Sequence, residues 1–182
     1  MNNASQIDLA EPVGATDHVL GPTHAPVVVV EYGDFECPTC KQATPAVDML
    51  LQRYPNKVCF VFRHYPLEVP HPHALAAAQA AECAGAQDKF WEMHKLLFEH
   101  QTHLKRQHLD GYAKQLGLDM PMFVSEMDDD VYLQRVREHI DSGKRSHVKS
   151  TPSFFVNGKL QDVSFGMHQL LDATEAALRS HR

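Results

Sequence analysis

Cysteine is scarce in this chain, which has four in 182 residues. A small secreted domain held together by a disulfide framework would need more, so that class is excluded. Cys59 and Cys83 are single and far apart, so the second closely spaced ligand pair of a structural zinc site is also missing. The other two form a Cys-x-x-Cys pair, Cys37 and Cys40. Half of a zinc site and a chance pair of unreactive thiols are the alternatives to a redox centre.

Runs of basic residues and an N-terminal apolar run are absent as well. The formal net charge is −6, with both signs interspersed, which argues against a nucleic-acid partner. Residues 1–17 contain neither the basic start and apolar core of a signal peptide nor a membrane span. We therefore expect a cytoplasmic protein with no membrane or nucleic-acid partner.

The strongest local pattern is an apolar run at 27–30, a short loop, and then Cys37-Pro38-Thr39-Cys40. Four consecutive valines predict a strand that is buried on both faces and central in its sheet. Pro38 suits the first turn of a helix, where its missing N–H would have had no intrahelical partner. A helix N-terminus favours a thiolate, so Cys37 is predicted to be a nucleophile with a lowered pKa. Cys40, one turn further on, can resolve a mixed disulfide.

The rest of the chain predicts an α/β protein with a helical insertion. A helix at 38–54 leads to a second apolar strand at 58–64, which makes a βαβ unit. Residues 73–147 show only helical periodicity. Asn157-Gly158 between apolar runs predicts a two-residue hairpin, and an amphipathic helix over 170–178 covers the sheet.

These patterns divide the chain into three parts. A flexible or loosely docked tail is expected at 1–17, the sheet domain at 18–72 and 148–182, and a helical subdomain at 73–147. The acidic run at 128–130 is interpreted as a helix N-terminus, where negative charge is stabilising. The thirteen histidines are scattered and are interpreted as solvated or capping residues, so no metal and no cofactor are predicted.

The order of elements and several residues resemble the thioredoxin fold in its DsbA-like branch. Pro45 lies where redox proteins of this fold kink the active-site helix, and Thr151-Pro152 lies where the family has a cis-proline facing the cysteines. The segments 62–67 and 89–94 resemble stretches common in bacterial DsbA-like proteins. The resemblance runs from about residue 17 to the end and implies a thioredoxin fold with thiol–disulfide oxidoreductase activity.

The resemblance also implies roles for single residues. Glu31, six positions before Cys37, matches a buried acid that helps to move protons at the inner cysteine; its alternative is a solvated carboxylate at the strand end. An ordinary trans proline in a turn is the alternative for Pro152. The residues implied to contact substrate are Pro38, Thr39, Thr151 and Pro152.

The dipeptide between the cysteines departs from DsbA, which has His where this chain has Thr39. A hydroxyl can donate a hydrogen bond but carries no charge, so we expect Cys37 to be less acidic than the DsbA cysteine, whose pKa is about 3.5. The absence of a signal peptide argues against a DsbA-type oxidising role.

We predict from these features a thiol–disulfide oxidoreductase that exchanges its Cys37/Cys40 dithiol with protein or small-molecule disulfides. Glutathione and a thioredoxin-type reductant are the candidate electron partners. Two alternatives remain. A kappa-type glutathione transferase or isomerase shares the fold but lacks the cysteine pair, and related thioredoxin domains fused to transporters favour an interaction or regulatory module.

Overall fold

The computed structural model describes residues 8–181, which form two compact units. The first unit contains residues 8–33, 42–63 and 141–181. The second contains residues 34–41 and 64–140, so the Cys-x-x-Cys motif belongs to the same unit as most of the predicted insertion. The boundaries predicted for a sheet domain and a helical subdomain stay a prediction.

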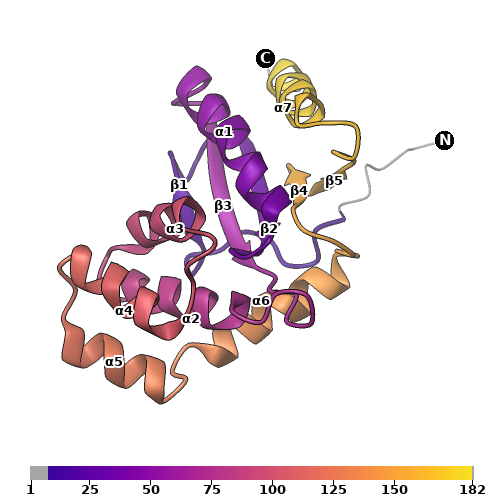
Figure 1. Ribbon diagram of the computed structural model, residues 1–182. Coiled ribbons are helices and arrows are strands. Elements are labelled where there is room, and N and C mark those ends of the chain that lie inside the picture. The colour runs from indigo at the N-terminus through magenta and orange to yellow at the C-terminus, as the bar shows by residue number, and fades with distance from the viewer. Residues whose placement is uncertain (1–7, 182) are drawn as a thin grey trace. The chain divides into compact units, whose positions relative to one another are not determined.

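A five-stranded sheet is the framework of the first unit (Figure 1). The strands are β1 His18–Leu20, β2 Val27–Gly33, β3 Val58–His64, β4 Ser153–Val156 and β5 Lys159–Gln161. Their order is β1-β3-β2-β4-β5, which places the valine-rich β2 in the centre, as predicted. The prediction missed β1, because three half-buried residues show no alternation; the pairing of Val19 with Val61 in β3 defines this strand.

The hairpin between β4 and β5 forms at the predicted Asn157-Gly158 pair. Both residues have positive φ, 46° and 78°, as a tight hairpin turn requires. The Asn157 side chain also accepts a hydrogen bond from the Val28 N–H (2.8 Å) and donates one to the Pro26 carbonyl (3.2 Å). This turn therefore closes the hairpin and ties it to the start of β2.

Two helices of the first unit follow the predicted ranges closely. They are α1 Pro38–Arg53, of which residues 42–53 belong to this unit, and α7 His168–Ser180. Buried residues of α1 at helical spacing are Ala43, Val47 and Leu50. Leu170 and Thr174 are the buried residues of α7, which packs on β4 and β2. Tyr54 donates a hydrogen bond to Glu175 (2.8 Å), which joins the end of α1 to α7.

The described part of the predicted tail, residues 8–17, is docked in the first unit. Leu9 is buried, and its N–H donates to the Gly158 carbonyl (3.0 Å). Arg63 forms two hydrogen bonds of 2.9 Å with the Asp17 carboxylate and donates to the carbonyl of Glu11 (2.8 Å). Residues 1–7 of the predicted tail lie outside the described residues.

The second unit is helical apart from its loops and the end of β3, as the periodicity of residues 73–147 predicted. Its helices are α2 Ala74–Gly85, α3 Phe90–Glu99, α4 Arg106–Gln115, α5 Met120–Asp128 and the larger part of α6 Leu133–Arg145. The alanine-rich α2 packs against α3, α4 and α5. The small side chains of α2 let these helices approach it closely. The small residues of α2 that are at most 2% exposed are Ala74, Ala77, Ala78, Ala80, Ala81, Cys83 and Ala84.

The interpretation of the acidic run at 128–130 as a helix N-terminus was wrong. Asp128 is the last residue of α5, and Asp130 has φ of 50°, a left-handed conformation that ends the helix. Asp128 lies 2.7 Å from the guanidinium of Arg106, and this ion pair offsets the unfavourable position of a carboxylate at a helix C-terminus.

Among the helices of residues 8–181, none combines the length and apolar character needed to cross a membrane.

Candidate redox site

The Cys-x-x-Cys pair lies where the sequence placed it, at the first turn of α1. Cys37 directly precedes the helix, and Cys40 lies within its first turn. Thr39 Oγ1 is 3.0 Å from the Cys37 sulfur, close enough to donate a hydrogen bond to a thiolate. The two thiols differ in access, because Cys37 is 6% exposed and Cys40 is fully buried. Of the two thiols, Cys37 is the one with exposed surface.

Asp34 organises the loop before the motif, and the sequence interpretation missed it. Its carboxylate, which is almost inaccessible, accepts hydrogen bonds from the N–H groups of Glu36 and Leu67 and from His71 Nδ1, all at 2.8 Å. Its carbonyl accepts from the Cys37 N–H (3.1 Å). Aspartate often accepts a hydrogen bond from the backbone N–H two residues later, so the contact with Glu36 could have been predicted from the sequence. The contacts with Leu67 and His71 have no signal in the sequence.

Hydrogen bonds of two more side chains join the same loop to other segments of the second unit. Gln101 donates from Nε2 to the carbonyls of Phe35 and Cys37, both at 2.8 Å. The Glu36 carboxylate accepts a hydrogen bond from the His73 N–H (2.7 Å). Both contacts join segments far apart in sequence, so neither could be read from the motif. Together they restrict the backbone that carries the reactive cysteine.

The ring of Phe35 anchors the loop by packing. It is 1% exposed, and its centroid lies 5.0 Å from that of Phe98, 5.5 Å from His94 and 6.0 Å from His64. Aromatic pairs at these distances contribute about 0.5–1.5 kcal/mol each beyond burial. The loop is thus fixed by both an apolar anchor and hydrogen bonds.

The other predicted site residues, Glu31, Thr151 and Pro152, belong to the first unit. Glu31 in β2 is 2% exposed, so its alternative interpretation as a solvated carboxylate is wrong. It pairs in register with Phe154, two residues after Pro152, so these predicted residues gather where β2 meets β4. The Thr151–Pro152 peptide bond is cis, and Thr151 is buried. A spatial relation of these residues to the cysteines stays a proposal.

Cys59 and Cys83 are suited to packing rather than to exchange. Both are at most 1% exposed. Burial raises the pKa of the Cys59 thiol. Burial, and then the nearby Glu126 carboxylate, raises the pKa of Cys83 to about 12. At neutral pH both are therefore thiols and poor nucleophiles.

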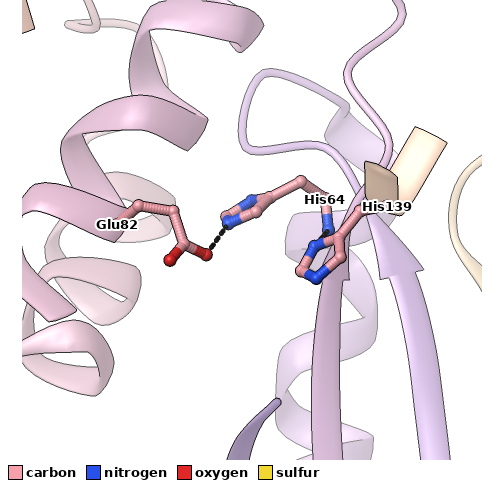
Figure 2. A group of neighbouring side chains, drawn as sticks. All are labelled: His64, Glu82 and His139. Atoms are coloured by element: carbon pink, nitrogen blue, oxygen red, sulfur yellow. Dashed lines mark hydrogen bonds and ion pairs between the residues drawn. The ribbon is translucent and has the colours of Figure 1, made fainter. Parts of the chain in front are cut away.

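A second polar cluster lies in the helical unit, and the interpretation of the histidines as solvated or capping residues missed it (Figure 2). Glu82 accepts from His64 Nε2 with one oxygen and from Arg135 Nε with the other, both at 2.8 Å. His139 Nδ1 accepts from the His64 backbone N–H (3.1 Å). A neutral His139 then carries its proton on Nε2, which leaves no lone pair there for a metal. The cluster is a buried hydrogen-bond network that fixes the end of β3 beside Phe35.

The sheet order, the helix that follows the central strand, and the cysteine pair at its start define a dithiol protein of thioredoxin fold. The family model described as Thioredoxin matches residues 14–175, and the chain belongs to this family.

Solved structures support the same fold class. The thioredoxin-like oxidoreductase from Silicibacter pomeroyi superposes with a TM-score of 0.81 at 27% identity, covering 97% of this chain and 99% of that one. BdbD from Bacillus subtilis gives 0.80 at 26% identity, covering 88% and 92%. Wolbachia pipientis alpha-DsbA1, at 17% identity and a TM-score of 0.79, supports the fold alone, covering 97% of this chain and 100% of that one. The predicted DsbA-like thioredoxin fold is confirmed.

The curated relatives found by sequence similarity are named as antiporters. A protein of Salinispora arenicola named Na(+)/H(+) antiporter NhaA 1 is 48% identical over 177 residues, which is 97% of this chain and 27% of the relative. A protein of Herminiimonas arsenicoxydans named Na(+)/H(+) antiporter NhaA is 37% identical over 166 residues, 91% of this chain and 26% of the relative. The chain therefore spans about a quarter of the length of these relatives.

Proposed function

We propose that this protein is a thiol–disulfide oxidoreductase with Cys37 as its nucleophile. The Cys37 thiolate attacks one sulfur of a substrate disulfide, forms a mixed disulfide and releases the other substrate sulfur as a thiolate, which takes up a proton. Cys40, as a thiolate, then attacks the Cys37 sulfur and releases the second substrate thiolate. The products are a reduced substrate and a Cys37–Cys40 disulfide, and the reverse sequence oxidises a dithiol.

The observation that carries this proposal is the position of Cys37 at the start of α1 with Thr39 Oγ1 at 3.0 Å. Unsatisfied N–H groups of the first turn and the Thr39 hydroxyl both stabilise negative charge on that sulfur. Cys40, buried and one turn away, is protected from substrate and placed to resolve.

The remaining assignments rest on the resemblance to DsbA-like proteins and, for Glu31, also on burial. Glu31 is a buried carboxylate, a group that is costly to bury without a role, and we assign it to proton transfer at Cys40. Pro38, Thr39, Thr151 and Pro152 are assigned to substrate contact.

The proposed substrates are proteins or small molecules that carry disulfides or thiols. Glutathione or a thioredoxin-type reductant would return the pair to the dithiol. The similarity to a structure titled thioredoxin-like oxidoreductase, at 27% identity, supports this chemistry. We place the reaction in the cytoplasm, and the oxidation state of the Cys37–Cys40 pair trapped in intact cells tests that location.

A second candidate function is a redox-sensing module of a cation transporter. The curated relatives named as antiporters favour it, because they contain a region 37–48% identical to this chain within a protein about four times longer. In this case a disulfide would oxidise the same dithiol, and the pair would not be reduced again rapidly enough for catalytic turnover. The kappa-type alternative is less favoured, because its relatives lack the cysteine pair that is retained here.

A trapping experiment tests the proposal and separates the two functions. The variant Cys40→Ala should accumulate mixed disulfides at Cys37, and mass spectrometry identifies the partner. Cys37→Ser/Cys40→Ala is the matched control and should trap nothing. Catalytic reduction of insulin by the wild type supports an oxidoreductase. Mixed disulfides with an antiporter but no insulin reduction support the module.

A further inference from the structure

Resting on the proposed function, we infer that Asp34 is a positioning residue for the second half-reaction. The turn that its side chain holds directs the Asp34 backbone N–H at the sulfur of the resolving cysteine, Cys40. The N–H stabilises the Cys40 thiolate when that thiolate must attack the mixed disulfide at Cys37.

The contact with the reacting atom is direct. The Asp34 nitrogen lies 3.4 Å from the Cys40 sulfur, within the range of an N–H···S hydrogen bond. Cys40 is fully buried, and burial disfavours the charged thiolate. Hydrogen bonds to an ionised acceptor are about twice as strong as neutral ones, so this donor matters most when Cys40 is charged.

The carboxylate of Asp34 fixes where that N–H points. Oδ1 accepts from the Glu36 N–H and closes a turn over Phe35. Oδ2 accepts from the Leu67 N–H and from His71, which attaches the turn to the loop that follows β3. Since all three bonds are 2.8 Å long and the side chain is 1% exposed, the turn has little freedom to rotate.

The two half-reactions use different donors, and the inference depends on this difference. Cys37 has the Thr39 hydroxyl at 3.0 Å and lies at the start of the helix. Cys40 lies inside the first turn, and its sulfur accepts from the Asp34 N–H. Loss of the Asp34 side chain should therefore slow the attack by Cys40 more than the attack by Cys37.

In this half-reaction the electrons and atoms balance within the protein and its bound partner. The Cys40 thiolate forms a bond to the Cys37 sulfur, the bond from Cys37 to the partner sulfur breaks, and the partner leaves as a thiolate that takes up a proton. The Cys40 sulfur is oxidised, the Cys37 sulfur stays in a disulfide throughout, and the partner sulfur is reduced to a thiol. Asp34 exchanges no atoms and no electrons.

The test measures both half-reactions with one probe, 5,5′-dithiobis(2-nitrobenzoate). Attack by Cys37 releases a first coloured thiolate, and resolution by Cys40 releases the second, so stopped-flow absorbance gives two rates. Asp34→Ala should slow the second phase about tenfold, which equals about 1.4 kcal/mol, and change the first less than about threefold.

Two variants control for a general effect on the fold. Asp34→Asn keeps an oxygen for the Glu36 N–H but places an NH2 that cannot accept from the Leu67 N–H, so its second rate should lie between those of Asp34→Ala and wild type. Glu92→Ala removes a half-exposed carboxylate of the same unit, on α3, and it should leave both rates within about threefold of wild type. Circular dichroism confirms that each variant is folded.

The outcomes separate this inference from the proposed function. A second phase that is unchanged in Asp34→Ala, or two phases slowed equally, overturns the role assigned to Asp34. The same slowing of the second phase in Glu92→Ala also overturns it, because loss of any carboxylate from this unit would then suffice. If wild-type protein releases no thiolate that depends on Cys37, the proposed function itself fails.

Discussion

Selective alkylation of native protein is the prediction that most directly tests which thiols are chemically active. Iodoacetamide added at pH 7 should label Cys37 first and leave Cys59 and Cys83 unmodified. Exposure alone does not explain such selectivity, because Cys37 is only 6% exposed while Cys59 and Cys83 are 1% and 0% exposed. The fraction of each cysteine present as thiolate must therefore account for the difference in labelling rate.

The magnitude follows from the pKa of Cys83, which burial raises to about 12. At pH 7 its thiolate fraction is about one in 100,000, against about one half for a thiol with a pKa near 7. A thiolate of higher pKa is intrinsically more nucleophilic. With a Brønsted coefficient of about 0.45, a difference of about five pKa units makes the Cys83 thiolate about 180 times more reactive than a thiolate of pKa near 7. The net disadvantage of Cys83 is about 300-fold before its burial is considered.

The pH dependence has a sign that follows from the same values. Between pH 7 and pH 9 the labelling rate of Cys83 should rise about tenfold per unit, since its pKa of about 12 lies above this range. The rate of Cys37 should level off at a lower pH than that of Cys83, because we expect the helix N-terminus to stabilise its thiolate.

Mass spectrometry of quenched samples gives the modification of each cysteine against time. The variant Cys37→Ser should lose the fast phase, and urea-unfolded protein should show similar rates at all four cysteines. Labelling of Cys83 as fast as Cys37 in folded protein would refute the reasoning from burial and helix position.

Two further predictions concern stability and redox poise. Arg63→Ala should lower the free energy of unfolding by about 3–5 kcal/mol, because it leaves the Asp17 carboxylate, 6% exposed, buried without its cation. Arg53→Ala, which removes a largely exposed pair with Glu175, should cost at most about 1 kcal/mol in the same urea titration, and equal losses would contradict the argument. Because Thr39 offers a hydroxyl but no charge, the reduction potential of the pair should lie between about −270 and about −120 mV. Equilibration with glutathione buffers measures it, and a value below that range would overturn the inference from Thr39.

Local sequence alone determined the central strand, the hairpin and the start of the helix that carries the motif. Four adjacent valines can be covered on both faces only inside a sheet, and Asn157-Gly158 accepts the left-handed backbone that a two-residue turn needs. Pro38 and the spacing of the cysteines marked the helix start. Each of these signals lies within a few residues, so no knowledge of distant contacts was needed.

Tertiary structure decided what holds that motif in place. Asp34 meets the N–H of Leu67 across 33 residues and Gln101 meets the Cys37 carbonyl across 64, and neither contact has a sequence pattern because it depends on how the loops fold back. The acidic run at 128–130 ends a helix rather than beginning one, because Asp130 is left-handed, and Asp128 forms its ion pair with Arg106 on another helix. Propensity and periodicity describe single segments, whereas ion pairs and buried hydrogen bonds are set by which segments meet.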